Sequence, residues 1–373
     1  MKIVITSPYD FSYPGGVQSH IFELSRELLR LNHDVTIAAP LSNKNIHNLP
    51  SVKFISLGKP VSFSFLGSKN RISINLLKII KCIFYLRKNK YDVIHIHEPL
   101  LPSQIIINIF TKTLKIASFH AYSHKKNYLY IVFNFLLKLV LRRISQKICV
   151  SKFSKLYINK YFLFESVIIP NGINLENFSY VSKKSKKSYK DISLLFVGRF
   201  DETRKGFPIL LSSFIELKKI YNDLRLIVIG PGNKNIYNKK SNLKDILFLG
   251  TIDQKNLPKF YQNSDIVCLP STENESFGII ILEAMATGSV LVSSDIDSYK
   301  DILCKNQYGF LFESKSVKSL TNTLSNIISK KINTKENLEN GLNNVKKYSW
   351  PKLVSEIIGV YTKEKNIINL GKF

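Results

Sequence analysis

Two glutamates eight positions apart carry the clearest chemical signal in this sequence. Glu275 stands directly before Ser276, Phe277 and Gly278, and Glu283 follows an apolar run. If a helix begins near residues 276–278, Glu275 lies in the preceding loop and Glu283 about a turn and a half inside, at ~1.5 Å per residue. The amides between them are unpaired at a helix N-terminus, where the partial positive charge attracts phosphate.

This order of carboxylate, anion site and carboxylate suits a nucleotide sugar. Glu275 could accept hydrogen bonds from sugar hydroxyls, the helix start could hold the pyrophosphate, and Glu283 could bind the ribose diol. The alternative is an amphipathic helix with one Glu in its first turns. Other residues must therefore decide between a site and a chance spacing.

A basic loop offers partners for such a diphosphate. Arg199 and Lys205 flank the segment 198–206, which directly follows an apolar strand. Arg provides planar donors and Lys a point charge, so the two could neutralise a diphosphate leaving group. An exposed basic loop in a basic protein is the alternative.

A glycine turn near the N-terminus is a second candidate phosphate contact. Pro14, Gly15, Gly16 and Val17 follow the first strand and open the first helix, where glycines let the backbone approach a ligand. The spacing is not G-x-G-x-x-G. A tight turn without a ligand explains the same residues.

Histidines and aspartates supply weaker hints of metal or sugar chemistry. His120 ends one strand, and His95 and His97 share a face of another, but no third metal ligand is evident from the sequence, so structural roles are preferred. Asp295 and Asp297 form a D-x-D pair after a strand, where an ordinary loop is the favoured interpretation. No metal site is predicted.

The elements that must position these residues alternate between strands and helices. In the first half the predicted strands are 2–6, 34–39, 52–57, 92–96, 116–119, 147–150 and 167–169, with a helix over 17–31. In the second half the predicted strands are 193–197, 225–229, 246–249, 266–269 and 290–293, with helices over 207–220, 256–262 and 277–287. Such alternation predicts an α/β protein with doubly wound parallel sheets.

The pattern occurs twice, which predicts two domains. A Lys- and Ser-rich stretch, Ser182 to Lys190, interrupts it as a linker. We therefore expect Rossmann-like domains at 1–180 and 181–350, facing each other across a cleft, because parallel sheets bind ligands beyond the carboxyl ends of their strands. A last helix begins near Pro351.

Composition limits the classes of protein that the chain can form. With 373 residues, 45% of them hydrophobic, the chain is long enough for two globular cores. Four scattered cysteines with no C-x-x-C favour a reducing compartment. The N-terminus lacks a signal-peptide pattern, and the longest apolar run, 128–141, is too short to cross a membrane and fits a buried or interfacial helix. A cytoplasmic location is expected.

The net charge of +27 favours a partner that carries phosphate. Part of the excess is explained by a Lys-, Asn- and Ile-rich composition. A helix over 74–88 places Lys78, Lys81 and Lys88 on one side and apolar residues elsewhere, which is typical of an element that binds an anionic membrane surface. A solvated face is the alternative, and no motif for stacking nucleic-acid bases supports nucleic-acid binding.

Taken together, the motifs resemble the retaining glycosyltransferases of family four, which have the GT-B fold. The resemblance covers nearly the whole chain. It is carried by segments that occur in the family's order: 14–18, 92–99, 119–121, 150–151, 170–173, 198–199, 205–206, Gly250 and the two glutamates. It implies two facing Rossmann-like domains, with the C-terminal helix at about 351–373 crossing back to the first.

The resemblance also implies roles for individual residues. Catalytic roles fall on His120, Arg199, Lys205 and Glu275. Donor contacts fall on Gly15, Gly16, Arg199, Lys205, Asp253, Glu275, Phe277, Gly278, Ile279 and Glu283. Acceptor contacts fall on Tyr9, Gln18, Arg71 and Lys125.

The activity implied is metal-independent, retaining transfer of a hexose, with mannose as one candidate, from a nucleoside-diphosphate sugar. The acceptor would be a membrane-associated lipid or lipid-linked glycan, and the enzyme peripheral on the inner face of the cell membrane. No cofactor and no nucleic-acid partner are implied. A transferase for lipopolysaccharide or capsule sugars and a nucleotide-sugar epimerase with the GT-B fold stay open as alternatives.

Overall fold

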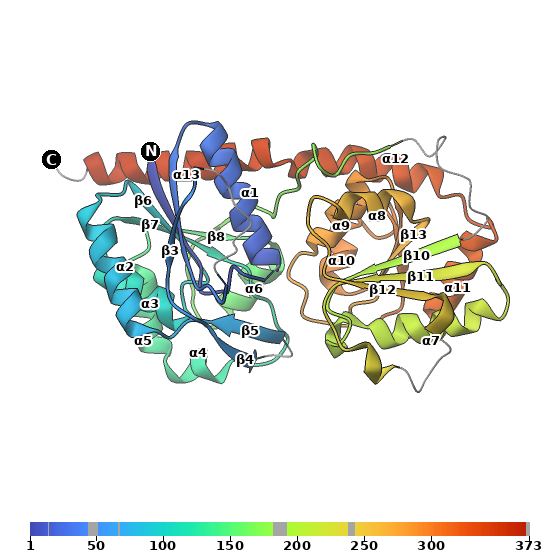
Figure 1. Cartoon of the computed structure of the whole chain (residues 1–373). Helices are drawn as coiled ribbons and strands as arrows, with labels where there is room; N and C mark the ends of the chain where they lie inside the picture. The colour runs from blue at the N-terminus through green and yellow to red at the C-terminus, as the bar shows by residue number, and fades with distance from the viewer. Residues whose placement is uncertain (14, 44–50, 66–67, 182–191, 238–242, 371–373) are drawn as a thin grey trace. The chain divides into compact units, whose positions relative to one another are not determined.

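The chain folds into two compact units, each built around one parallel sheet (Figure 1). The computed structural model describes residues 1–373 except 14, 44–50, 66–67, 182–191, 238–242 and 371–373. The predicted linker at 182–190 lies outside the described residues. Unit 1 comprises Met1–Gly172 and Trp350–Phe373, and unit 2 comprises Ile173–Ser349.

Unit 1 contains a seven-stranded sheet whose pairings are all parallel. In spatial order the strands are β3 (Lys53–Ser56), β2 (Asp34–Ala39), β1 (Lys2–Thr6), β6 (Val93–His97), β7 (Leu114–Phe119), β8 (Gln146–Cys149) and β9 (Val167–Ile168). A separate antiparallel hairpin, β4 (Val61–Phe65) and β5 (Ser68–Ile72), was not predicted, although the alternation of Ser and Phe in β4 has the two-residue period of a strand.

Helices cover both faces of this sheet. On one face α2 (Leu76–Lys88), α3 (Pro102–Phe110), α5 (Asn134–Arg142) and α6 (Lys152–Asn159) bury apolar residues with Val4 of β1. On the other, α1 (Gly16–Arg30) and α13 (Trp350–Leu370) pack with Ile3 and Ile5. Consecutive residues of β1 thus serve opposite cores, as expected for a strand buried on both sides.

The C-terminal helix α13 belongs to unit 1, which confirms that the chain returns to its first domain. Trp350 is buried against Gly172, where a Cβ would come within 2.6 Å of the indole. Further along α13, the Tyr361 hydroxyl lies 2.6 Å from His95 Nδ1, and Lys365 forms an ion pair with Asp92 at 2.7 Å.

Unit 2 contains a six-stranded, all-parallel sheet. Its spatial order is β12 (Ile246–Gly250), β11 (Leu224–Ile229), β10 (Ile192–Val197), β13 (Ile266–Leu269), β14 (Val290–Ser294) and β15 (Phe310–Phe312). Helices α7 (Phe207–Lys218) and α11 (Val317–Ile328) pack on one face. Helices α8 (Leu257–Asn263), α9 (Ile279–Ala286) and α10 (Asp297–Ile302) pack on the other.

Two details differ from the sequence-based expectations. The first unit ends at Gly172 rather than at residue 180, because Ile173 and Phe178 pack into the core of unit 2. The apolar run at 128–141 is not one helix. It forms α4 (Tyr128–Val132) and α5, which meet at Phe133, a residue outside helical geometry with φ −95° and ψ 17°.

Candidate active site

The basic loop after β10 is held against the loop after β13 by a glycine. Gly206 has a left-handed backbone, with φ 68°, and a Cβ at this position would lie 1.8 Å from the carbonyl oxygen of Pro270. Only glycine fits such a close approach. The short helix Thr203–Lys205 just before it therefore points its basic side chains toward residues 271–275.

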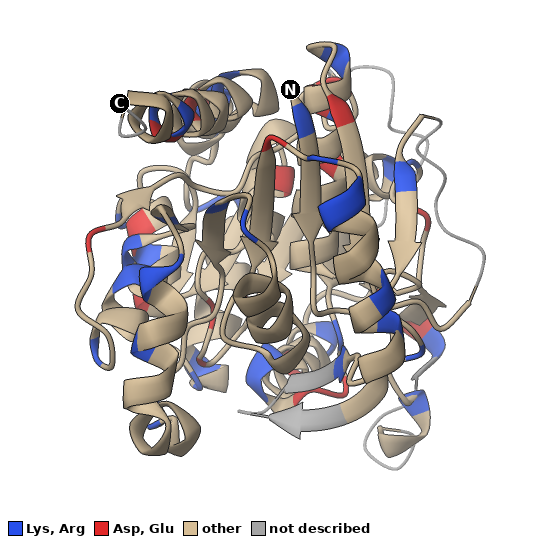
Figure 2. Ribbon diagram, turned by 90° about the vertical axis from the view of Figure 1, so that its left-hand side faces the viewer, with Lys and Arg blue, Asp and Glu red and all other residues tan. Residues whose placement is uncertain are grey.

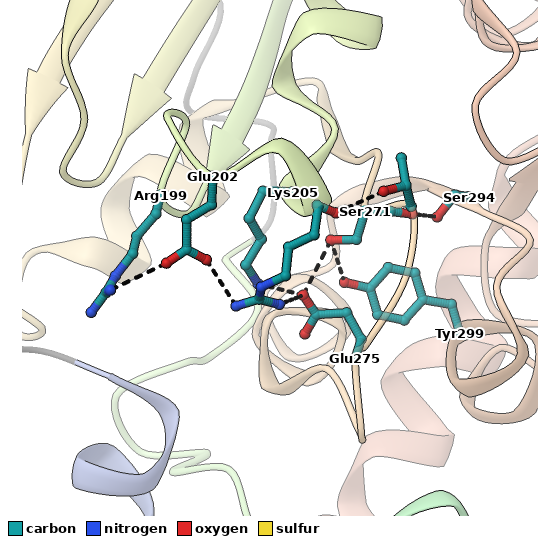
Figure 3. A network of polar contacts seen from close by, with 9 residues as sticks. Arg199, Glu202, Lys205, Ser271, Glu275, Ser294 and Tyr299 are labelled. Atoms are coloured by element: carbon teal, nitrogen blue, oxygen red, sulfur yellow. Dashed lines mark hydrogen bonds and ion pairs between the residues drawn. The ribbon is translucent and has the colours of Figure 1, made fainter. Parts of the chain in front are cut away.

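A network of ion pairs joins these two loops (Figure 3). Glu275 Oε1 lies 2.8 Å from Arg204 Nη1 and 2.6 Å from Lys205 Nζ. Arg204 also pairs with Glu202 Oε2 at 3.0 Å, and Arg199 Nη1 lies 3.2 Å from Glu202 Oε1. Three cations and two carboxylates thus form one chain, and they come from segments about seventy residues apart in sequence.

The electrostatics of the network keep Glu275 ionised. Burial raises the carboxyl pKa, but the charges of Lys205 and Arg204 outweigh that effect and lower the pKa of Glu275 below its usual value. Burial lowers the pKa of Arg204, but the negative charges of Glu275 and Glu202 outweigh that effect and raise it above its usual value. Within the described residues, the contacts to Glu275 fall on Oε1, so its second oxygen is available to a ligand hydroxyl.

Polar residues behind Glu275 fix its position. The Ser271 hydroxyl donates to Glu275 Oε1 over 3.4 Å, and the Tyr299 hydroxyl donates to Ser271 Oγ over 3.1 Å. Ser294 Oγ in turn donates to the carbonyl of Ser271. Such second-layer contacts hold a binding carboxylate in one orientation.

Within the described residues, the start of α9 has no side-chain cap. Gly278 precedes the helix with φ 94°, and a Cβ there would lie 2.8 Å from the Tyr299 ring. Because glycine has no side chain, it cannot cap the first amides of the helix. The helix therefore begins at Ile279, one to three residues later than expected, and its N-terminus can bind an anion.

Glu283 lies inside α9 and is buried. Tyr261 donates its hydroxyl to Glu283 Oε2 over 2.6 Å. Burial raises the pKa of Glu283 to about 7, and the Tyr261 hydrogen bond opposes this only in part. The carboxyl group therefore titrates near neutral pH and can switch between donating and accepting a hydrogen bond.

The other predicted donor residues of unit 2 lie outside the ion-pair network. Phe277 is buried, with its ring 5.8 Å from that of Tyr348, so a ligand could reach only its backbone. Asp253 is exposed and accepts the amide of Lys255 at the start of α8. Asp295 accepts the amide of Ser314 and lies 3.6 Å from Lys300 in the short loop after β14, whereas Asp297 is the first residue of α10.

Sequence reasoning missed Arg204, Glu202, Ser271 and Tyr299. Arg204 contacts both carboxylates of the network, whereas Arg199 contacts it only at one end. The alternation of basic and acidic residues over 199–205 was a usable signal for a charge-paired loop. Tyr299 had no such signal, since its place beside Ser271 depends on the packing of α10.

In unit 1, a buried cluster of histidines lies at the ends of β6 and β7. His97 Nδ1 is 2.8 Å from His120 Nε2, and the ring of His20 lies 5.0 Å from that of His120. His20 Nδ1 lies 2.8 Å from Asn171 Oδ1. Burial lowers the pKa of His20 to about 4 and that of His97 and His120 well below the usual value, so all three are neutral at pH 7.

Glu98 binds the backbone that carries His120. Its Oε1 accepts the amides of His120 and Ala121 over 2.6 and 2.8 Å, and Glu98 itself has a left-handed backbone, with φ 51°. Burial raises the pKa of Glu98 to about 7 despite these two hydrogen bonds. Strained residues of this kind concentrate at functional sites.

The histidine cluster adds His20 as a third candidate metal ligand, which was not evident in the sequence. One ring nitrogen each of His20, His97 and His120 lies within 4.8 Å of the others. In the described part of the chain, His20 Nε2 and His97 Nε2 have no hydrogen-bond partner. Neutral imidazoles bind transition metals, so these residues could hold an ion.

The remaining predicted residues of unit 1 make the following contacts within the protein. Gly15 caps α1, and a Cβ there would lie 2.5 Å from Gln18 Oε1, while Gly16 begins the helix. Gln18 donates to the carbonyl of Asp10 over 3.0 Å. Burial and the charge of Glu98 raise the pKa of Tyr9 well above its usual value.

Arg71 and Lys125 lie at the protein surface. The Arg71 guanidinium stacks on the Tyr13 ring at 3.6 Å, and the Arg71 carbonyl accepts the amide of Asp10. Lys125 is exposed in the loop after β7, where its amide donates to Ser123 Oγ. Lys125 is exposed and Arg71 is half-buried, and their roles stay predictions.

Two family models together match most of the chain. Residues 14–177 match the model described as Glycosyltransferase Family 4, and residues 179–344 match Glycosyl transferases group 1. The boundary between the two matches falls close to the boundary between the two units.

Solved structures with the same fold are glycosyltransferases and related synthases. Sucrose-phosphate synthase (tll1590) from Thermosynechococcus elongatus superposes with a TM-score of 0.79 at 18% identity, covering 97% of this chain and 98% of that one. Anabaena Alr3699/HepE in complex with UDP and glucose superposes with a TM-score of 0.77 at 17% identity, covering 97% and 100%. The fold is therefore that of the two-domain GT-B glycosyltransferases.

Relatives that align over nearly their whole length are named as mannosyltransferases. The phosphatidyl-myo-inositol mannosyltransferase of Mycobacterium tuberculosis (strain ATCC 25618 / H37Rv) is 29% identical over 369 residues, covering 97% of this chain and 96% of the relative. That of Propionibacterium freudenreichii subsp. shermanii is 29% identical over 370 residues, covering 97% and 95%. The chain belongs to glycosyltransferase family 4, and it is a transferase enzyme.

Proposed function

We propose that the protein is a retaining hexosyltransferase that uses a nucleoside-diphosphate sugar and a membrane-associated lipid or lipid-linked acceptor. The observation that carries this proposal is the ion-pair network of Arg204, Lys205 and Glu275 next to the uncapped start of α9. It combines cations and amides for a diphosphate with a carboxylate oxygen for a sugar hydroxyl. Mannose is the candidate hexose because the relatives are named as mannosyltransferases.

The chemistry that we propose needs no carboxylate base. The acceptor oxygen attacks the anomeric carbon from the face that the diphosphate leaves, and the departing phosphate oxygen takes the acceptor proton. In this proposal Lys205, Arg199 and the α9 amides stabilise the negative charge that develops on the diphosphate, and the ion pairs of the two cations support it. Glu275 and Glu283 position the donor, through the sugar and the ribose respectively.

For the acceptor we propose a hydroxyl held near His120 in unit 1. Glu98 fixes the backbone of His120, and Tyr9, Gln18, Arg71 and Lys125 would contact acceptor groups. We further propose that neither a metal nor a cofactor is required, and that the enzyme works on the inner face of the cell membrane. Among the described residues, no helix is both long and apolar enough to cross a bilayer.

A thermal-shift screen with GDP-, UDP- and ADP-sugars tests the donor class, because a ligand that binds only the folded protein raises the melting temperature. The donor found is then incubated with phosphatidylinositol, other lipids and oligosaccharides in parallel. Transfer to a lipid supports the proposal. Conversion of the donor without an acceptor would identify an epimerase instead, and transfer only to oligosaccharides would favour a lipopolysaccharide or capsule enzyme.

A further inference from the structure

Helices α4 and α5 expose an unusual amount of apolar surface. Eight large hydrophobic side chains between residues 128 and 139 are exposed, among them Val132 at 74%, Phe135 at 73% and Tyr128 at 72%. The others are Leu129, Ile131, Phe133, Leu136 and Leu139. Contiguous apolar patches on this scale mark interaction sites in folded proteins. We call residues 128–139 the apolar segment.

Hydrogen bonds and ring contacts fix the apolar segment to residues that precede and follow it in the chain. Asn127 caps α4 by accepting the amide of Tyr130, and its own amide donates to the Tyr161 hydroxyl over 2.8 Å. Asn134 donates to the carbonyl of Tyr161 over 2.8 Å, and the Tyr130 ring packs 5.5 Å from Phe162. The exposed side chains therefore stand on a fixed base provided by α6 and the residues after it.

The apolar segment continues into the neighbouring helices. The carbonyls at the end of α3 accept hydrogen bonds from Arg143, which follows α5, and from Arg87 of α2, over 2.9 and 2.8 Å. The helices α2, α3, α5 and α4 follow one another along one side of unit 1 (Figure 1). Further exposed apolar residues on α2 and α3 are Leu76, Leu77, Ile80, Phe84, Ile109 and Phe110.

Helix α2 exposes both basic and apolar side chains. Its buried face consists of Ile79, Cys82, Ile83 and Leu86, so Lys78 and Lys81 are exposed together with Leu77 and Phe84. The sequence analysis predicted a basic side for this helix and apolar residues elsewhere on it. Their exposure means that basic and apolar groups face solvent side by side.

The part of the chain that carries the apolar segment is strongly basic, and the exposed Glu165 is the next acidic residue after it. Between residues 35 and 164 the sequence contains only two acidic residues, Asp92 and Glu98. Asp92 is paired with Lys365, and Glu98 is buried. Figure 2 looks onto this side of unit 1 and shows Lys and Arg outnumbering Asp and Glu.

The positive charge favours an anionic partner for the apolar segment. A second copy of the chain would bring two positive surfaces together, which opposes self-association through this face. A nucleic acid would match the charge but not the aliphatic side chains. A bilayer with anionic lipids satisfies both features, because basic residues meet headgroups and apolar residues enter the boundary with the acyl chains.

The apolar segment also connects with the candidate acceptor site. Tyr130 is the inward-facing aromatic residue of α4, and burial followed by the charge of Glu98 raises the pKa of Tyr130 well above its usual value. Glu98 is the residue that holds the backbone of His120. Residues 121–127 join His120 directly to α4, so the apolar segment and the candidate acceptor residue are neighbours along the chain.

We propose that residues 128–139 form a monotopic insertion element that anchors unit 1 in the headgroup and acyl boundary of an anionic bilayer. Binding by insertion goes beyond the electrostatic adsorption that the basic helix α2 predicts. Only the delivery of a lipid acceptor to His120 rests on the proposed function. The anchoring itself depends on the exposed side chains alone.

The insertion is tested by flotation of the full-length protein with phosphatidylcholine vesicles that contain ~30 mol% phosphatidylglycerol. The double variant Val132→Ser/Phe135→Ser should bind at least tenfold more weakly than the native chain. Ile220→Ser is the matched control, since Ile220 is 68% exposed but lies in unit 2. Vesicle binding of the native protein should persist in part at about 0.5 M salt, where surface electrostatics are screened.

A reporter variant gives an independent measurement. The chain has a single tryptophan, Trp350, which is buried, so Phe135→Trp adds one exposed indole. Its emission should shift to shorter wavelength on vesicles and be quenched by brominated acyl chains. Melting temperatures of all variants should match the native protein, because the substituted side chains contact solvent.

Several outcomes would overturn the proposal. Undiminished vesicle binding of the double variant, complete loss of native binding at about 0.5 M salt, or an unshifted Phe135→Trp emission would each do so. So would a concentration-dependent dimer that the double variant abolishes. Failure of every nucleotide sugar to bind would instead refute the proposed function and leave the vesicle result unaffected.

Discussion

Glu275 is the residue on which the proposed donor chemistry depends most, because two cations share one of its oxygens. Lys205 lies 2.6 Å from Oε1 and Arg204 lies 2.8 Å from it. The arrangement keeps the carboxylate charged and keeps the cations ordered before a donor arrives. Preorganisation of this kind lowers the barrier to charge development, since no reorganisation is needed at the moment of reaction.

Substitution of the cations tests this role. Lys205→Ala and Arg199→Ala should each lower turnover at saturating donor at least tenfold, because loss of a charge-assisted contact costs ~1.5–3 kcal/mol. Lys259→Ala, an exposed lysine on α8, is the matched control and should leave turnover unchanged. Native-like turnover of Lys205→Ala with an unchanged melting temperature would exclude the proposed role.

The raised pKa of Glu283 predicts that donor binding depends on pH. The pKa of its carboxyl is raised to about 7, so the group gains its negative charge as the pH rises through 7. Only the ionised form accepts hydrogen bonds with both oxygens, and Tyr261 occupies one of them. Affinity for the nucleotide sugar should therefore increase from pH 6 to pH 8 (about one unit on either side of the pKa).

Calorimetric titration of the donor across this range provides the measurement. Glu283→Gln should show weaker binding that no longer changes with pH. A nucleotide sugar is the right probe, since its diphosphate has no ionisation near neutral pH, unlike a free nucleoside diphosphate. An equally steep profile in Glu283→Gln would assign the dependence to another group.

At the scale of elements, the start of α9 is set by a glycine that no other residue can replace without strain. Gly278 has φ 94°, and an added Cβ would meet the Tyr299 ring at 2.8 Å. Gly278→Ala should destabilise the protein by ~1–2 kcal/mol through the left-handed backbone alone. It should also weaken donor binding, because the helix amides and Tyr299 move together.

Gly359→Ala is a control that should change the stability of the protein in the opposite direction. Gly359 lies inside α13 with no atom within 4 Å of an added Cβ. Alanine there should stabilise the protein by up to ~1 kcal/mol and leave donor affinity unchanged. Thermal denaturation and donor titration of both variants, measured together, separate a backbone effect from a ligand effect.

At the scale of the whole molecule, the remaining question is whether the enzyme needs a metal. The proposed mechanism uses cations and amides of the protein, so turnover should be unchanged after treatment with a chelator and passage through a desalting column. Metal analysis of the protein before treatment accompanies the assay. Loss of activity that zinc restores would contradict metal independence and direct attention to His20, His97 and His120.

Strand positions were predictable because they depend on local pattern. The predicted strands 2–6, 34–39 and 266–269 coincide with β1, β2 and β13, since strands buried on both faces appear as continuous apolar runs. The short strand β15 was missed. It follows a helix and a turn with little apolar length to distinguish it.

The sequence by itself determined the α/β fold with two parallel sheets and the family, and it predicted Glu275, Glu283, Arg199 and Lys205 as donor contacts, since these depend on local pattern and short motifs. Only the tertiary structure decided that Arg204 links Glu202 to Glu275 and that His20 joins His97 and His120. It also decided that eight large apolar side chains between residues 128 and 139 are exposed. The reason is that convergence and exposure depend on which distant segments pack together, and an apolar run has the same composition in a core as on a surface.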